Sequence, residues 1–279
     1  GAPSAVFHTL DVTSTPSVET FAAWARGLTP RLDVLINNAG GALGLDPVAT
    51  ARDEDWEGMF QSNVLGVLRM TRATLPLLTA NPGSILINIG SIAGRVAYEG
   101  GAAYCAAKAG ELQITRALRL ELNGTGVRVC TLDPGMAETE FSVVRFKGDE
   151  ARARKVYEGV VPLTADDVAE AMLWMASRPA HVNIDEMVIK CTDQAAIHKV
   201  HRRPAPSRPC EQQRPAPLCR NSTPPPAFCR LRDSLSRQRS QPRAPVPARH
   251  LWADLLGPTG RDGAPAGLAR RSRQLRGHR

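Results

Sequence analysis

Residues 33–40 read DVLINNAG, a short apolar run that ends in two asparagines, an alanine and a glycine. Two later segments have the same form: residues 84–91 read SILINIGS and residues 127–135 read VRVCTLDPG. Short apolar runs that stop at glycine or at polar residues are typical of buried strands in a parallel sheet. Residues 53–78 and 104–122, which lie between these runs, have the spacing of helices. Strands and helices therefore alternate along this part of the chain.

The flanking segments extend this alternation in both directions. We predict a strand over residues 6–10 and a helix over 18–26 before the first run, and a helix over 166–176 and a strand over 187–191 after the last. The sequence thus predicts an α/β fold with a Rossmann-like, doubly wound parallel sheet. Ligands of such sheets bind beyond the carboxyl ends of the strands. The unusual polar and glycine residues stand at those ends: Asp11, Asn37 to Gly40, Ser91, Pro134 and Gly135.

Charge and proline are unevenly distributed along the 279 residues. Residues 203–279 contain sixteen arginines, no lysine, four acidic residues and thirteen of the 22 prolines. That stretch carries a net charge of +12 in a chain whose total is +8, which leaves about −4 for residues 1–202. A segment rich in arginine and proline, without apolar periodicity, does not form a packed core. We therefore expect a globular domain over residues 1–202 and a disordered tail over 203–279.

The tail has two interpretations. As a functional element it would be a basic arm that binds nucleic acid or a membrane surface. Its use of arginine without lysine is also expected from out-of-frame translation of a GC-rich gene, and we favour this explanation. A nucleic-acid partner is therefore not expected.

The six cysteines divide equally between the two parts, and their spacing lacks the close pairs of a zinc site. We expect reduced thiols, no metal ion and a cytoplasmic location. The sequence has no run of about eighteen apolar residues, so no membrane-spanning helix is expected. A signal peptide is not expected either.

Tyr104 and Lys108 are four residues apart at the start of the helix predicted over residues 104–122. This spacing places the two side chains on one face, one turn apart. A free phenol is too weak an acid to exchange protons near neutral pH, and an adjacent ammonium group favours the phenolate. On its own, however, this spacing is more often an ordinary pair on a helix surface. The other residues at the strand ends decide between the two interpretations.

Those residues form an ordered set along the chain. Its members are NNAG at 37–40, Asn63, Ser91, Tyr104 with Lys108, and the pair Pro134 and Gly135. With this set the chain resembles the short-chain dehydrogenase/reductase family from residue 5 to about residue 202. The resemblance implies an oxidoreductase that transfers a hydride between an alcohol carbon and a nicotinamide cofactor.

The family resemblance implies a role for each of four catalytic residues. Tyr104 would exchange the proton, and Lys108 would support it while holding the nicotinamide ribose. Ser91 would hydrogen-bond the substrate oxygen and stabilise its developing charge. Asn63 would hold a water molecule of the proton relay.

The same resemblance implies the contacts of the cofactor. The residues are Asp11, Val12, Asn38, Ala39, Gly40, Tyr104, Lys108, Pro134, Gly135 and Thr139. The first two would meet the adenine, the residues of the NNAG motif the adenosine, and the last three the nicotinamide and the phosphates.

Further stretches are similar to one branch of the family, the NADP-dependent 3-hydroxy acid dehydrogenases. They are ETEF at 138–141, VRFKGD at 144–149, PAHVNI at 179–184 and VHR at 200–202. The branch implies NADP as cofactor, with NAD still open, and a small 3-hydroxy acid substrate of the serine or 3-hydroxypropionate type. Arg145 is a candidate for binding the substrate carboxylate, since a guanidinium pairs with it through two hydrogen bonds; a structural role is equally expected. Relatives usually form homotetramers.

Two alternatives remain open: another reductase of the family, acting on an acyl-thioester or a sugar, and a non-catalytic protein with a basic nucleic-acid-binding tail. The sequence also lacks one family feature, the glycine-rich phosphate loop of the first β-α unit. We therefore expect residues 1–202 to be an N-terminally truncated domain without its first two β-α units, and the chain alone to be inactive. The residues that choose NADP over NAD would lie in the missing part.

Overall fold

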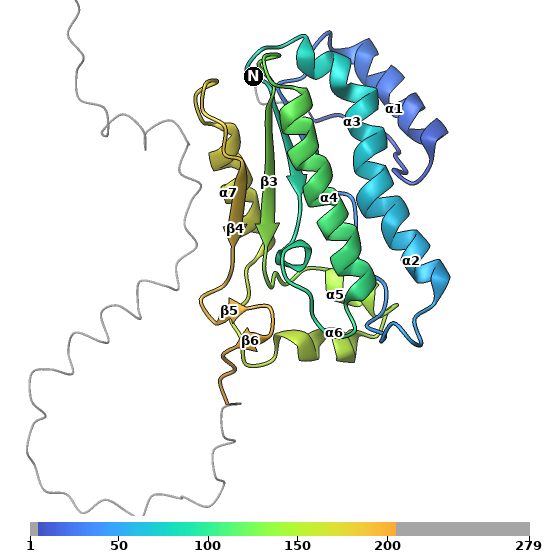
Figure 1. Cartoon of the computed structure of the whole chain (residues 1–279), viewed down its shortest axis with the longest axis vertical. Coiled ribbons are helices and arrows are strands. Elements are labelled where there is room, and N and C mark those ends of the chain that lie inside the picture. The colour runs from blue at the N-terminus through green and yellow to red at the C-terminus, as the bar shows by residue number, and fades with distance from the viewer. Residues whose placement is uncertain (1–4, 205–279) are drawn as a thin grey trace, which may run out of the picture. The chain divides into compact units, whose positions relative to one another are not determined.

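A computed structural model describes residues 5–204, and a parallel β-sheet with helices on both faces forms its centre (Figure 1). The helices are α1 (Thr15–Leu28), α2 (Asp53–Phe60), α3 (Gly66–Thr79), α4 (Ala102–Glu121), α5 (Phe141–Arg145), α6 (Glu150–Tyr157) and α7 (Ala165–Ala176). The strands are β1 (Val34–Asn37), β2 (Ile85–Ile89), β3 (Arg128–Pro134), β4 (Glu186–Ile189), β5 (Gln194–Ala196) and β6 (Lys199–Val200). The last two form a small antiparallel pair.

The four main strands lie side by side in the order β1-β2-β3-β4, and every neighbouring pair is parallel. Ile36 lies opposite Ile87, Ile87 opposite Cys130, and Leu132 opposite Met187. Successive strands are joined by helical segments, as parallel pairing requires. This arrangement confirms the predicted α/β fold with a Rossmann-like parallel sheet.

The core lies on both faces of the sheet because neighbouring side chains of a strand point in opposite directions. Ile85 and Ile87 pack with Met175 of α7 on one face. Leu86, between them, packs on the other face with Leu78 at the end of α3 and with Leu122 just after α4. All five side chains are buried, so the apolar runs of the sequence became strands covered on both sides.

The long helical segment after β1 contains one irregular turn. Helix α2 passes into a π turn, η1 (Gln61–Leu65), before it continues as α3. A π turn inserts one residue and is frequent at functional sites. Asn63 stands in the middle of this turn and is fully buried.

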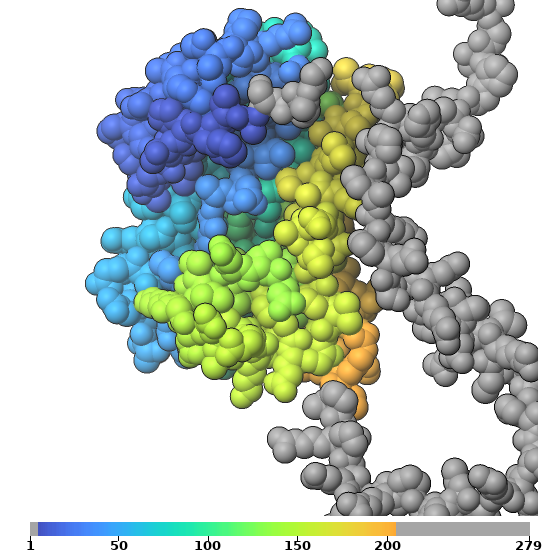
Figure 2. Space-filling model, turned by 180° about the vertical axis from the view of Figure 1, so that it is seen from behind, coloured from blue at the N-terminus to red at the C-terminus, as the bar shows by residue number. Residues whose placement is uncertain are grey.

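Residues 6–10, which were predicted to be a strand, do not form one. A strand is held by hydrogen bonds to a neighbour, and no strand lies beside this stretch in the described part of the chain. Phe7 is 91% exposed and Val6 is 61% exposed. These residues, the darkest blue in the space-filling view, form part of the surface (Figure 2). The prediction was wrong because it rested on apolar character alone.

Several predictions concern residues outside the described range. The predicted tail lies outside it except for Arg203 and Pro204, as do Cys210, Cys219 and Cys229. Within residues 5–204, the three cysteines are buried and free, and no helix is long and apolar enough to cross a membrane. The same residues contain no cluster of three His, Cys, Asp or Glu side chains that would hold a metal ion.

Candidate active site

Loops from the carboxyl ends of β1 and β2 meet the start of α4 in one buried cluster. Ala42 follows β1, Ala93 lies in a 3-10 turn, η2 (Ile92–Gly94), that follows β2, and both belong to the same apolar cluster as Tyr104. Met59 of α2 and the partly buried Phe141 of α5 complete the contacts. The sheet therefore gathers residues that are far apart in the sequence around the tyrosine.

Tyr104 lies in the first turn of α4. The helix begins after Gly100, whose backbone has a φ of +73°, and Gly101 is its N-cap. Glycine is favoured at a positive φ because it has no side chain to clash. The Tyr104 ring is buried, with the ring of Phe141 5.5 Å away and the guanidinium of Arg145 5.8 Å from its centre.

Lys108 is buried one turn further along α4, on the side that faces the sheet. Its ammonium donates one hydrogen bond to the main-chain oxygen of Ile89 at the end of β2, at 2.7 Å. A second goes to the carboxylate of Glu111, at 2.6 Å. Burial opposes the charge of Lys108, but the carboxylate of Glu111 outweighs it, and the pKa of the lysine is raised.

Ser91 lies directly beyond β2, before the 3-10 turn. Its backbone is extended, and its hydroxyl oxygen accepts a hydrogen bond from the main-chain N–H of Ala93 at 3.1 Å. This contact caps the turn and fixes the orientation of the serine side chain. The hydroxyl hydrogen is then directed by whatever group lies on its other side.

Asn63 joins the π turn to the loop that follows β1. Its Nδ2 atom donates to the main-chain oxygens of Gly41, at 2.9 Å, and Met59, at 2.8 Å. The Oδ1 atom has no hydrogen-bond partner within residues 5–204. Gly40 lies directly against it: a methyl group at position 40 would stand 2.5 Å from Oδ1. The glycine of the NNAG motif is therefore required by close packing against Asn63.

A recess of about 300 Å³ opens beside Tyr104. Leu43, Trp56 and Met59 contribute apolar wall, and Arg145 contributes a positive charge. The Nε atom of Arg145 donates to the main-chain oxygen of Gly44 at 2.9 Å, which anchors the guanidinium at the wall. Figure 2 shows the lime-coloured α5–α6 segment beside the cyan residues of α2, from which the opposite wall comes.

The residues assigned to the cofactor occupy three places at the same end of the sheet. Asn38, Ala39 and Gly40 follow β1 and are exposed. Pro134 ends β3, and the N–H of Gly135 donates to the main-chain oxygen of Ile189 at 2.7 Å. These positions agree with the expected carboxyl-end location.

The remaining assigned residues lie further out. Asp11 is exposed and accepts hydrogen bonds from Thr13, which lower the pKa of the carboxyl. Val12 packs against Gly66 at the start of α3. Thr139 is exposed and accepts a hydrogen bond from the N–H of Phe141. The structure thus places all of them on loops, and assigns no ligand contact to any.

Comparison with known proteins places this geometry in a family. The family profile described as short chain dehydrogenase matches residues 2–150. The chain is 44% identical over 195 residues to the NADP-dependent 3-hydroxy acid dehydrogenase YdfG of Escherichia coli, which covers 69% of this chain and 79% of the relative. The chain belongs to the short-chain dehydrogenase family. It is accordingly an oxidoreductase, as the motifs around Tyr104 predicted.

Two further relatives support the same membership. The NADP-dependent 3-hydroxy acid dehydrogenase of Schizosaccharomyces pombe is 44% identical over 174 residues, which is 62% of this chain and 67% of that protein. A solved structure, the closed form of serine dehydrogenase complexed with NADP+, superimposes with a TM-score of 0.66 at 43% identity. That match covers 70% of this chain and 80% of the other.

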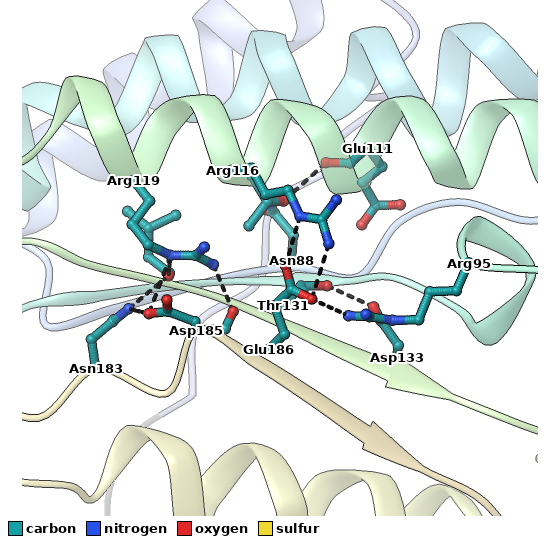
Figure 3. Close-up of polar contacts among 12 residues, drawn as sticks. Asn88, Arg95, Glu111, Arg116, Arg119, Thr131, Asp133, Asn183, Asp185 and Glu186 are labelled. Carbon is teal, nitrogen blue, oxygen red and sulfur yellow. Dashed lines mark hydrogen bonds and ion pairs between the residues drawn. The ribbon is translucent and has the colours of Figure 1, made fainter.

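This short-chain dehydrogenase also has a charged network behind the site, between α4 and β4 (Figure 3). Arg95 bonds both Asp133, at the end of β3, and Glu186 on β4. Arg116 of α4 bonds the other oxygen of Glu186 at 2.7 Å. The hydrogen bond from Arg116 and the contact with Arg95 lower the pKa of Glu186 to about 2.

The network and Glu111 were not predicted from the sequence. A signal for Glu111 exists: it lies seven and eleven residues before Leu118 and Leu122, on the helix face that is otherwise apolar. A charged residue on such a face has to find a partner inside the protein. The arginines of the network gave no comparable signal, because Arg95 and Glu186 are 91 residues apart in the chain.

Proposed function

We propose that this short-chain dehydrogenase transfers a hydride between NADP(H) and the hydroxyl or carbonyl group of a small 3-hydroxy acid, of the serine or 3-hydroxypropionate type. The observation that carries the proposal is the grouping at the start of α4. Tyr104 borders a recess of about 300 Å³ that also contains Arg145, and Lys108 lies one helical turn behind it. A recess of that size suits a small substrate.

The residues at the strand ends fit a dinucleotide. Exposed backbone follows β1 at Asn38, Ala39 and Gly40, where small side chains leave room for a close approach. In relatives the name or title specifies NADP, including the solved serine dehydrogenase complex. When bound, the nicotinamide supplies the acceptor or donor of the hydride.

The chain's own residues would manage the proton. In the oxidation direction the substrate hydroxyl loses its proton to the Tyr104 oxygen, while the adjacent carbon loses a hydride, and the carbon–oxygen double bond forms. The Lys108 ammonium favours the phenolate that accepts this proton. Ser91 donates its hydroxyl hydrogen to the substrate oxygen as charge develops there. Asn63 orders the loop between β1 and α2, and would hold the water of the relay.

The substrate carboxylate would pair with Arg145. The guanidinium lies 5.8 Å from the Tyr104 ring and is fixed to the main chain at Gly44. A three-carbon acid held there by its carboxylate presents its hydroxyl carbon to the tyrosine. Two relatives of this chain have 3-hydroxy acid dehydrogenase in their names.

The proposal includes a division of the chain. Residues 1–202 would form the dehydrogenase domain, and 203–279 a tail without a catalytic role. Catalysis would need the first two β-α units of the family fold as well, because the strand ends within residues 5–204 carry no glycine-rich phosphate loop. Val34 and Ile36 of β1, each 42% exposed, would be covered by them. We expect a cytoplasmic homotetramer, in keeping with the free thiols.

The test compares two substrates that differ in one group. The enzyme expressed from its complete gene is assayed for NADP+ reduction with 3-hydroxypropionate and with propan-1-ol. We expect kcat/KM to be at least about tenfold higher for the acid, a difference of about 1.4 kcal/mol. Equal values, or activity only with acyl-thioesters or sugars, would contradict the proposed substrate class.

A further inference from the structure

Glu111 is a carboxylate placed in the interior of the protein. It is 1% exposed and lies on the face of α4 that packs on the sheet, next to the fully buried Ala107. Burying an ionised group is strongly unfavourable unless a partner compensates for it. A side chain that served only to fill this space would be apolar, as Leu112 is.

Its compensation comes from one residue, Lys108. The Oε2 atom accepts a hydrogen bond from the ammonium at 2.6 Å, while Oε1 has no partner among the residues described. Burial raises the pKa of Glu111 to about 7, against the opposing effect of Lys108. Glu111 is thus poorly satisfied for a structural residue, and its one contact is with the lysine behind Tyr104.

Other charged groups nearby are already paired. Asp133 at the end of β3 faces the same region, but it is bonded to Arg95. Arg116, one turn beyond Glu111 on α4, is bonded to Glu186 (Figure 3). Below the pair, Asn88 of β2 donates to Thr115, which bonds the main-chain oxygen of Glu111. Lys108 and Glu111 therefore form a separate pair inside a polar surround.

We propose that Glu111 is a positioning residue of the active site: it anchors the Lys108 ammonium beneath Tyr104 and weakens the electrostatic effect of that ammonium on the phenol. The inference rests on the proposed function, in which Tyr104 and Lys108 act as a pair. Two of the three N–H bonds of Lys108 are held by Ile89 and Glu111, which leaves one for a ligand. The negative charge of Glu111 opposes the positive charge that favours the phenolate.

The consequence is a measurable dependence on charge. Glu111→Gln retains an oxygen that accepts from Lys108 but removes the negative charge, so the ammonium acts on Tyr104 without opposition. We expect the acidic limb of the pH profile of kcat/KM for alcohol oxidation to move down by about one pH unit, from Coulomb's law at an effective dielectric constant of ~20. Glu121→Gln, at the exposed end of the same helix, is the matched control and should leave the profile in place.

A second measurement needs neither substrate nor cofactor. The ultraviolet absorbance of tyrosinate is titrated in the protein, and the same titration of the Tyr104→Phe variant is subtracted, which isolates Tyr104 from Tyr98 and Tyr157. In Glu111→Gln the isolated transition should move to lower pH. Glu111→Met, which loses the hydrogen bond as well, should show the same direction and should also bind NADPH several-fold more weakly in a fluorescence titration.

The outcomes separate the two proposals. An unmoved pH profile and an unmoved tyrosinate transition in both Glu111 variants, with only a lower melting temperature, would overturn the role of Glu111 and return it to the structural class. If Tyr104→Phe retained full turnover, the proposed function itself would fail. The tyrosinate titration would still report whether Glu111 acts on Tyr104.

Discussion

The ammonium of Lys108 donates a hydrogen bond to the main-chain oxygen of Ile89, 2.7 Å away, and this contact joins α4 to the carboxyl end of β2. The lysine is therefore held from two sides, by the strand and by Glu111. Since the same strand leads directly into Ser91, the positions of Ser91, Tyr104 and Lys108 are set by one pair of packed elements. A change in this pair should affect stability and catalysis together.

Removing Lys108 should be more harmful than removing the whole buried pair. Lys108→Met leaves the carboxylate of Glu111 buried without a partner, which should lower the free energy of unfolding by about 3 kcal/mol. The double variant Lys108→Met, Glu111→Leu should recover most of that loss, because no charge remains inside. Urea unfolding of the two single variants and the double variant measures the difference. Additive losses would show that the pair is not coupled.

Gly40 should tolerate alanine much less well than its neighbour Gly41. A methyl group at position 40 would lie 2.5 Å from Oδ1 of Asn63, whereas nothing lies within 4 Å at position 41. We expect Gly40→Ala to lower the melting temperature and to weaken NADPH binding, since overpacking typically costs about 1–3 kcal/mol. Gly41→Ala is the control. Equal effects of the two changes would exclude the close contact as the reason for the glycine.

Arg145 should matter for acids and not for neutral alcohols. Arg145→Leu is expected to raise KM for 3-hydroxypropionate by about tenfold or more and to leave the kinetics of propan-1-ol nearly unchanged, because only the acid has a charge to lose. Arg152→Leu serves as the control, since Arg152 stacks on Phe146 on the neighbouring helix, outside the residues that line the recess. A uniform effect on both substrates would make Arg145 a structural residue.

The pairing of Glu186 should appear as a pH-dependent contribution to stability. Its pKa is lowered to about 2 from an ordinary value of 4.5, chiefly by the hydrogen bond from Arg116, so its contribution is present above pH 4.5 and is lost as the pH falls through about 2. Glu186→Gln should therefore destabilise the protein at pH 7, by about 1 kcal/mol for a partly exposed pair, and progressively less toward pH 2.

Glu150→Gln provides the comparison for Glu186. Glu150 forms an exposed pair with Arg154, with both side chains at least 70% accessible. Thermal unfolding of this variant should show little loss of stability at any pH. A loss for Glu186→Gln that stays constant between pH 7 and pH 2 would contradict the ion-pair explanation.

The sequence predicted the elements whose apolar runs are buried locally, and it failed where a distant partner decides. The runs at 84–89 and 127–132 became central strands because both of their faces are covered. The run at 6–10 has the same apolar character but no strand beside it, so it forms none. Apolar pattern alone does not report whether a strand has a neighbour.

The candidate site divides in the same way. Ser91, Tyr104 and Lys108 follow motifs with fixed spacing, and the structure brings them to one end of the sheet. Glu111 was missed although its position on an apolar helix face was visible. The network of Arg95, Asp133 and Glu186 depends on contacts across 38 to 91 residues, which no local pattern reveals.

Tyr104→Phe tests the central claim most directly, because it removes one hydroxyl and leaves the buried ring in place. In the enzyme expressed from its complete gene, we expect NADPH binding and melting temperature to stay close to those of the unaltered protein, while kcat falls by a factor of about 10² or more. Tyr157→Phe removes a hydroxyl that is bonded to Ser142 and to the main-chain oxygen of Ala137, and it should retain turnover. A Tyr104→Phe enzyme with kcat within a few-fold of the unaltered protein would contradict the account.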